Sequence, residues 1–221
     1  MTGFSWDWGF VWSLIPGLLE GLWVTVQATA AGSVLALLLG FVWCVLGLAN
    51  IPVVSSISKL MVNFFRGTPL LVQLYFLFYV LPGFGLRLPA FVAGCIGLGL
   101  HNGAYMSEAL RAGVEAIPWG QWEACYALGV SRRWTLGRII FPQALRTAVP
   151  MLGNYVVVMF KEAAQLSTIT VIEVLGKATN IGFEHFRFIE PMTMAGFLYF
   201  IVSYISARMI TRLEDHLAAK T

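Results

Sequence analysis

The sequence has 221 residues, of which 58% are hydrophobic and 11% are charged. Soluble domains carry about 25% charged residues, so the composition excludes an ordinary soluble protein and predicts an all-α integral membrane protein. The formal net charge of +3 is small, and we expect no nucleic-acid partner. Cys44, Cys95 and Cys125 have no CxxC spacing, and we interpret them as small buried hydrophobes rather than as a disulfide or a metal site.

Five apolar segments are long enough to cross a bilayer, which requires about 20 helical residues. Trp6, Trp8 and Trp12 precede the first segment and are typical of the aromatic residues at a membrane interface. This N-terminal part lacks the basic region of a signal peptide, so none is expected. No break in composition marks a second domain, and residues 1–221 are expected to form one transmembrane domain. The predicted spans are residues 18–48, 60–81, 90–110, 147–170 and 193–210.

The connections between these spans differ in character. Residues 50–58 are expected to form a turn, and residues 82–89 a short glycine-rich loop. Gly67 and Pro69 are expected to bend or break the second span, because proline removes a backbone donor and clashes with the preceding turn. Residues 177–192 carry several charges and are expected to form a solvated hairpin or a lid.

Polar side chains inside the first and third spans have two interpretations. Thr25, Gln27 and Thr29 are expected to form hydrogen bonds between helices, as membrane bundles often do, or to line a substrate path. His101 and Asn102 lie in the third span. A single histidine in a helix is more often packed and hydrogen-bonded than a ligand, so a role in a substrate pathway is the second interpretation for this pair.

The fourth span contains Lys161, Glu162 and Gln165. Ionisable groups inside a bilayer cost at least about 2.5–3.5 kcal/mol each, and they are retained where they pair or line a path. In a helix that starts at Thr147, Lys161 lies about 21 Å along the axis, inside the hydrocarbon core. The alternative is that the helix has already reached the far interface there, where charges are well tolerated.

The positions of Lys and Arg predict the orientation of the chain. With five spans the two termini lie on opposite sides of the membrane, and ten of the 14 Lys and Arg residues fall on the side of the C-terminus. The positive-inside rule therefore predicts that the N-terminus is outside and the C-terminus is cytoplasmic. The ten cytoplasmic residues are Lys59, Arg66, Arg111, Arg132, Arg133, Arg138, Arg146, Arg208, Arg212 and Lys220, and the residues on the opposite side are Arg87, Lys177 and Arg187.

The cytoplasmic connection after the third span is predicted to form two short helices, over about residues 119–140, that lie across the membrane surface. Gly129 is suited to the left-handed residue that ends the first helix, and Ser131 to the N-cap of the second. Pro142 would mark the entry to the fourth span. A basic interfacial helix that holds anionic lipid is the alternative, and membrane lipid is an expected partner in either case.

This segment resembles the cytoplasmic motif of binding-protein-dependent ABC importer permeases. That motif is EAA, three residues, Gly, nine residues, then I-x-L-P, and here it is Glu123-Ala124-Cys125, Gly129, Ile139, Phe141 and Pro142. Two apolar replacements, Cys125 and Phe141, are the departures from it. The stretches 66–74, 104–108 and 120–129 further resemble the polar amino acid branch of the family, so the resemblance covers about residues 15–212.

The resemblance implies a type I ABC importer permease fold and a transport function without enzymatic activity. It implies that two permease subunits, identical or paralogous, form the pore in the bacterial inner membrane, and that a periplasmic or lipid-anchored solute-binding protein delivers the solute. A cytoplasmic ATPase dimer would bind ATP and Mg²⁺, because this chain lacks a Walker A pattern, and no cofactor or catalytic residue is expected here. The residues implied in coupling to the ATPase are Glu123, Ala124, Gly129, Arg132, Arg133, Ile139 and Pro142.

The fourth span departs from the resemblance where a substrate would pass. This branch typically reads much like KDTSLLSVIGVAEL, whereas the present chain has KEAAQLSTITVIEV from Lys161 to Val174. The acid is kept as Glu162, but the following small residues and Gln165 enlarge the site and add an amide. We therefore expect a substrate with both charges, such as an amino acid, an opine or an ectoine-like solute. The expected pathway residues are Lys161, Glu162, Gln165, His101 and Asn102.

Two other classes of protein remain as alternatives. An ion-coupled secondary transporter of a small zwitterion often has inverted repeats with broken helices in matching halves, and no such pairing is found in the sequence. A membrane enzyme would need a metal site or a nucleophile–base pair, and His101, Glu108 and Glu162 have no metal-ligand spacing.

Overall fold

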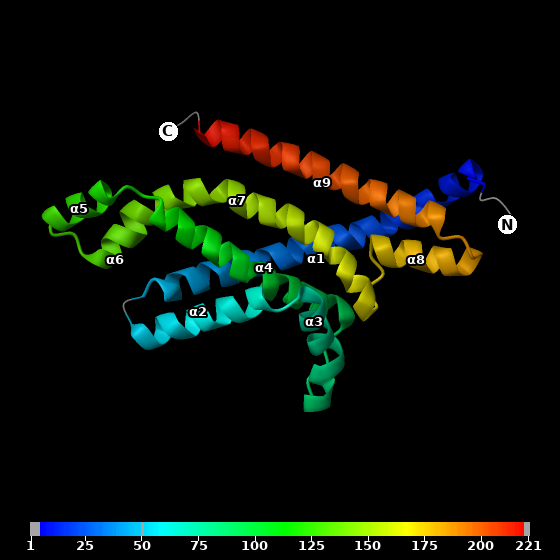
Figure 1. The fold of residues 1–221 in the computed structure, drawn as a ribbon, viewed down its shortest axis with the longest axis horizontal. Helices are drawn as coiled ribbons and strands as arrows, with labels where there is room; N and C mark the ends of the chain where they lie inside the picture. The colour runs from blue at the N-terminus through cyan, green and yellow to red at the C-terminus, as the bar shows by residue number, and fades with distance from the viewer. Residues whose placement is uncertain (1–4, 50, 219–221) are drawn as a thin grey trace.

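The computed structural model describes residues 5–49 and 51–218, and these residues form helices without any strand (Figure 1). Short π-helical segments cover Phe76–Val80 and Thr135–Ile140, and 3-10 segments cover Leu81–Phe84 and Ala163–Ile169. The α-helices in chain order are α1 (Trp8–Gly47), α2 (Pro52–Gly67), α3 (Leu70–Tyr75), α4 (Ala90–Glu115), α5 (Trp119–Ala127), α6 (Arg132–Trp134), α7 (Phe141–Glu162), α8 (Val174–His185) and α9 (Ile189–Ala218).

Two of the described helices, α1 and α9, are long and apolar enough to cross a membrane by themselves. Two further spans result if each of two bent helix pairs counts as one: α2 with residues 70–84, and residues 132–169 with α8. The helix α4 does not qualify by composition, although it was predicted as a span. It carries His101 and Asn102, and the protein buries both.

The first helix begins at Trp8, so it extends beyond the N-terminal end of the predicted span of residues 18–48. The side chain of Asp7 accepts a hydrogen bond of 3.1 Å from the backbone N–H of Phe10 and caps the helix. The exposed Trp8 and Trp12 therefore lie on α1 itself.

The predicted turn over residues 50–58 was also wrong, because α2 begins at Pro52. Proline suits the first turn of a helix, where its missing N–H would have no partner. The hydroxyls of Ser55 and Ser58 then donate to the carbonyl oxygens of Gly47 (2.9 Å) and Trp43 (2.7 Å). These bonds hold α1 and α2 together as a hairpin.

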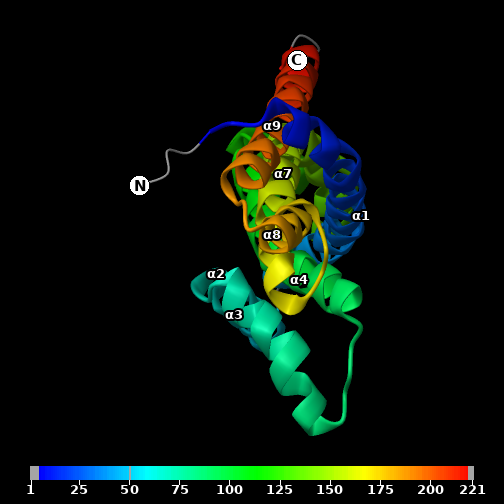
Figure 2. The ribbon, with the colours of Figure 1, turned by 90° about the vertical axis from the view of Figure 1, so that its right-hand side faces the viewer.

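The predicted break after Gly67 is present as a bend of 102° between α2 and the following segment. Residues 70–84 extend from the rest of the bundle as an arm (Figures 1 and 2). The amide nitrogen of Gln73 donates to the carbonyl oxygens of Phe65 (2.9 Å) and Thr68 (3.1 Å). A side chain thus satisfies carbonyl groups that the bend removes from the helix, which is the condition for a break at membrane depth.

The segment predicted as a polar hairpin, residues 177–192, is mostly helix α8, so the predicted loop or lid was wrong. The carboxylate of the buried Glu173 accepts from the backbone N–H groups of Leu175 (3.0 Å) and Gly176 (2.7 Å) and caps this helix. The backbone N–H of Val174 donates to Thr25 Oγ1 at 3.3 Å. One of the polar residues of the first span therefore does bond another element.

The helix α4 lies at the centre of the bundle and packs against α1, α2, α3 and α7. Small residues allow this contact, because they let helix backbones approach each other closely. A Cβ on Gly40 of α1 would lie 2.9 Å from the carbonyl oxygen of Gly103, and a Cβ on Gly113 would lie 2.7 Å from that of Ala144. Helix α4 thus contacts both α1 and α7 with almost no side chain between the backbones.

The contact between α4 and α7 makes a testable prediction about Gly113. Alanine there places a methyl group 2.7 Å from a carbonyl oxygen, and we expect a loss of about 1–3 kcal/mol in stability, as for other overpacked sites. Gly196→Ala on α9 is the control, because a Cβ there meets nothing within 4 Å and alanine favours a helix by up to about 1 kcal/mol. Thermal unfolding in detergent should give a midpoint temperature below that of the parent for Gly113→Ala but not for Gly196→Ala. Equal midpoint temperatures in the two variants would contradict the close contact.

Candidate functional site

Two regions of the structure hold the residues that the sequence indicates. The first is residues 119–140, which we call the docking segment. It lies at the end of the molecule where α1 turns into α2 and where α9 ends, far from α8 (Figure 1). The second, the central polar cluster, consists of Gln73, His101, Asn102 and Glu162.

An apolar contact attaches the docking segment to the spans. Val114 at the end of α4 packs with Ile140 and Ala144, and Trp122 and Leu136 cover them. The two ends of the docking segment therefore share one small core with α4 and α7.

The first helix of the docking segment ends as the sequence predicts. Gly129 has a φ of +68°, which lies in the left-handed region that favours glycine. Its N–H donates to the carbonyl oxygen of Tyr126 at 3.0 Å, and the N–H of Val130 donates to that of Cys125 at 3.0 Å. This pair of bonds is a Schellman motif, which closes the helix end.

The second helix of the docking segment differs from the prediction in two ways. It is continuous with α7, so residues 132–169 form one helical rod, and Pro142 lies in the first turn of α7 without interrupting it. Ser131 makes no side-chain capping bond, and its carbonyl oxygen instead accepts from the hydroxyl of Thr135 at 3.2 Å. The predicted pair of short helices is therefore one short helix and the extension of a long one.

The docking segment presents both polar and apolar side chains to its surroundings. Glu123, Ala124, Arg132 and Arg133 are exposed, while Ile139 is half-buried. Pro142, which lies just beyond the docking segment in α7, is also exposed. Trp119 and Leu128 are 65% and 80% exposed. Large apolar side chains grouped with charges on one surface are typical of a binding interface.

The central polar cluster joins α4 to the end of α7. The amide nitrogen of Asn102 donates to Glu162 Oε2 at 2.8 Å and to the carbonyl oxygen of Leu98 at 3.2 Å. His101 directly precedes Asn102 on α4, and its Nδ1 atom lies 3.1 Å from the amide nitrogen of Gln73. Three of the five predicted pathway residues therefore lie in this cluster, together with a fourth member from the bend after α2.

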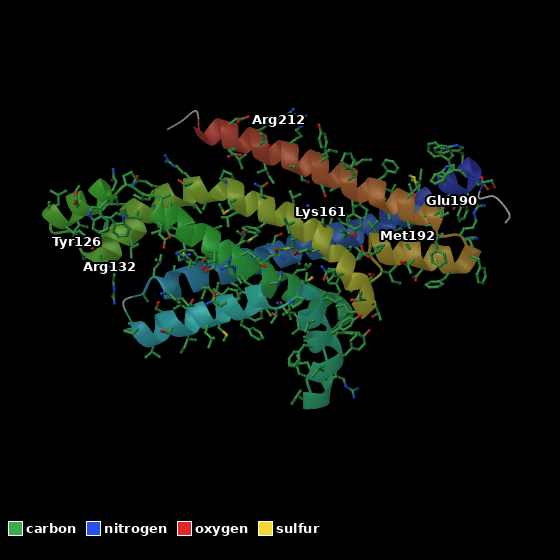
Figure 3. All side chains as sticks on the ribbon, viewed as in Figure 1. Tyr126, Arg132, Lys161, Glu190, Met192 and Arg212 are labelled. Carbon is green, nitrogen blue, oxygen red and sulfur yellow. The ribbon has the colours of Figure 1, made fainter. Side chains whose placement is uncertain are left out.

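The two other predicted pathway residues lie beside the cluster. Lys161 is exposed near the end of α7, where Figure 3 labels it, and within the described part of the chain it makes no hydrogen bond or ion pair. Gln165 is half-buried in the 3-10 segment that continues α7. The structure thus places a carboxylate, an amide and a free ammonium within about one turn of the end of one helix.

Nearer the docking segment, α4 carries a charged network. Glu108 accepts a bond of 2.7 Å from Arg111, as the spacing on the helix predicts, and Arg66 Nη1 lies 3.5 Å from the same carboxylate oxygen. The guanidinium of Arg66 also lies over the ring of Tyr105, 5.4 Å from its centroid. This network links the end of α2, just before the bend that follows Gly67, to α4.

Sequence reasoning did not identify Gln73 or Glu173 as structural centres. A glutamine within an apolar run beside a predicted break was a usable signal, because the broken helix leaves carbonyl groups that need donors. Glu173 lies just beyond the predicted fourth span, so its complete burial depends on the neighbouring helices. Among the described residues, no group of three or more His, Cys, Asp or Glu side chains is arranged to hold a metal ion.

The fold and these two regions define a helical membrane protein with a surface element suited to another subunit. The sequence profile described as "Binding-protein-dependent transport system inner membrane component" matches residues 32–218. The chain belongs to this family, whose members are membrane components of transport systems rather than enzymes.

Several relatives are similar over nearly their whole length. A probable amino-acid ABC transporter permease protein of Sinorhizobium fredii, y4tG, is 37% identical over 98% of this chain and 96% of that protein. The glutamine transport system permease protein GlnP of Escherichia coli is 33% identical over 94% of this chain and 96% of its own length. The octopine transport system permease protein OccM of Rhizobium radiobacter is 33% identical over 94% and 89%.

Solved structures agree with this assignment. A crystal structure described as an amino acid ABC transporter with histidines has a TM-score of 0.92 and 30% identity, and the match covers 96% of this chain and all of that one. A structure of the MetNI methionine ABC transporter in an inward-facing conformation has a TM-score of 0.73 at 16% identity, over 91% and 98% of the two chains. The second likeness shows the fold alone.

The left-handed Gly129 makes a prediction about the docking segment. A branched residue in this conformation costs roughly 1–2 kcal/mol, so Gly129→Val should loosen the end of α5, whereas Gly129→Asn should be closer to the parent because asparagine tolerates this conformation. Trypsin cleaves after Arg132 and Arg133, which follow the turn. Faster cleavage there is expected in Gly129→Val than in Gly129→Asn, and equal rates in all three proteins would contradict it.

Proposed function

We propose that this chain is the permease subunit of an ATP-driven, binding-protein-dependent importer of polar amino acids or amino-acid-like solutes. The observation that carries the proposal is the exposed docking segment with its family motif, in a chain whose whole length matches that of permease relatives. The relatives named for an amino acid, for glutamine and for octopine support the class of substrate.

The proposed topology has five spans, with the N-terminus outside and the C-terminus in the cytoplasm of a bacterial cell. It counts α1, the α2–α3 pair, α4, the rod of residues 132–169 and α9. The start of α1 and the end of α9 lie at opposite ends of the molecule, and the docking segment lies at the end of α9 (Figure 1). The excess of Lys and Arg on the side of the C-terminus supports this orientation, because such residues favour the cytoplasmic side of a membrane.

The proposed partners follow from this topology. A cytoplasmic ATPase dimer would bind the docking segment and would hold ATP and Mg²⁺, while a second permease, a copy or a paralogue, would complete the pore. A solute-binding protein would deliver the solute at the opposite end. The exposed aromatic and apolar groups of the docking segment, with Glu123 among them, suit a cleft in a partner subunit.

A mechanical connection between the two regions supports coupling. Residues 132–169 form one rod that begins in the docking segment and carries Glu162 near its other end. We propose that motion of the ATPase moves this rod against α4 and changes the contact between Glu162 and Asn102. The short apolar core around Ile140 would transmit the force, because close-packed side chains do not deform easily.

The proposed substrate carries both a positive and a negative charge. Glu162 would receive an amino group, and the exposed Lys161 a carboxylate, from a solute that reaches the end of α7. Gln165 supplies a further donor and acceptor, which suits an amino acid derivative with extra polar groups.

Glu123→Lys tests the docking segment. We expect the ATPase subunit to be lost from the purified complex, because the substitution reverses a charge on the exposed surface of α5. Arg87→Glu is the matched control, since it reverses an exposed charge in the loop before α4. Co-purification from membranes measures the association. Full retention of the ATPase and of transport in Glu123→Lys would refute the docking assignment.

Three substitutions test the substrate region. Asn102→Ala removes the donor to Glu162 and should lower uptake about tenfold to a hundredfold, because a bond to a charged group contributes about 1.5–3 kcal/mol. Lys161→Ala and Gln165→Leu should alter uptake or the preference among amino acids. Ser56→Leu, on an exposed position of α2, is the control. Unchanged uptake and preference in all three variants, measured in vesicles with ATP, would exclude this region as the pathway.

A further inference from the structure

A groove of about 770 Å³ runs between the C-terminal part of α1 and the start of the rod that begins at Arg132. Phe41 and Val45 of α1 form one wall, and Leu136 and Phe141 form the other. The rings of Phe41 and Phe141 meet edge to face, with centroids 5.3 Å apart. The volume lies in the range of cavities that hold small-molecule ligands, about 300–1,000 Å³.

Among the described residues that line this groove, the charged side chains are those of Arg132 and Arg133, and none is Asp or Glu. Both arginines are exposed, and neither forms an ion pair within the part of the chain that the structure describes. Figure 3 labels Arg132, the first residue of α6, at the end of the molecule where α1 turns into α2. Arg138 differs, because its guanidinium lies over the ring of Trp134, 5.2 Å from the centroid.

These properties define the chemistry of an occupant. Apolar walls favour hydrocarbon, because burial of apolar surface contributes roughly 25 cal/mol per Å². Two unpaired guanidinium groups favour a phosphate, to which arginine forms short charge-assisted hydrogen bonds. An anionic phospholipid carries both hydrocarbon chains and a phosphate. It is also always present at a membrane surface, where this end of the molecule is proposed to lie.

We propose that this groove binds an anionic phospholipid of the cytoplasmic leaflet. Its phosphate would lie between Arg132 and Arg133, and an acyl chain would lie along Phe41 and Val45. Basic pockets between helices at the cytoplasmic surface are suited to such headgroups. The inference rests on the proposed function for the orientation of the chain, and it assigns these two arginines to lipid rather than to the ATPase.

The test uses the complete transporter, with its ATPase, purified in detergent and supplied with a 4:1 mixture of phosphatidylcholine and phosphatidylglycerol. Native mass spectrometry counts the phosphatidylglycerol molecules retained by each complex. The double variant Arg132→Gln/Arg133→Gln removes the charges, and Gly137→Leu fills the groove, since Gly137 lines it and a Cβ there meets nothing within 4 Å. The controls are Arg138→Gln, and Gly196→Leu on α9, where a Cβ also meets nothing.

We expect both groove variants to retain at least one phosphatidylglycerol fewer than the parent and the controls. Retention that is unchanged in either groove variant would overturn the proposal. Loss of the ATPase with full lipid retention would also overturn it, because the groove would then bind the ATPase. Displacement of the lipid by millimolar inorganic phosphate would show that the site recognises phosphate without hydrocarbon, which contradicts a lipid site. Loss of the ATPase from Glu123→Lys is measured separately, so failure of the lipid site and failure of the proposed function are distinguishable.

Discussion

The close contact between α1 and α4 is the constraint on which the rest of the structure depends. A Cβ on Gly40 would lie 2.9 Å from the carbonyl oxygen of Gly103, so the two backbones meet without side chains between them. In a bilayer, apolar side chains gain little by moving from lipid to protein, and van der Waals packing of this kind holds helices together. This contact and those with α2, α3 and α7 surround α4 with protein, and the side chains of His101 and Asn102 on α4 are buried.

The buried polar groups of α4 define how the other helices are placed. Asn102 holds the end of α7 through Glu162, and His101 lies beside Gln73 at the bend after α2. Each of these bonds joins the central helix to an irregular part of another helix, where backbone groups or a charge need a partner. A movement of the rod of residues 132–169 therefore changes hydrogen bonds as well as packing. The docking segment lies at one end of that rod and the polar cluster near the other.

Local features of the chain could be predicted, and features that depend on distant residues could not. The left-handed Gly129, the break near Pro69 and the pairing of Glu108 with Arg111 each depend on a few adjacent residues, and all three were correct. The helix α8 was missed because its charged residues resemble a solvated loop, while its cap, Glu173, is buried against α1 and α9. The second docking helix was taken as separate because Pro142 suggested a boundary, yet proline is tolerated in the first turn of a helix and here lies within a continuous rod.

The sequence by itself determined that this protein is helical, that it belongs in a membrane and that one polar connection has the motif of a permease. Composition, charge placement and motif spacing carry that information, because each is a property of the chain rather than of its packing. The tertiary structure alone decided which polar groups meet: Asn102 with Glu162, Gln73 with the carbonyl groups at the bend, and two arginines with an apolar groove. These contacts join residues from different helices, and only the packing of small residues along α4 brings those helices close enough for the bonds to form.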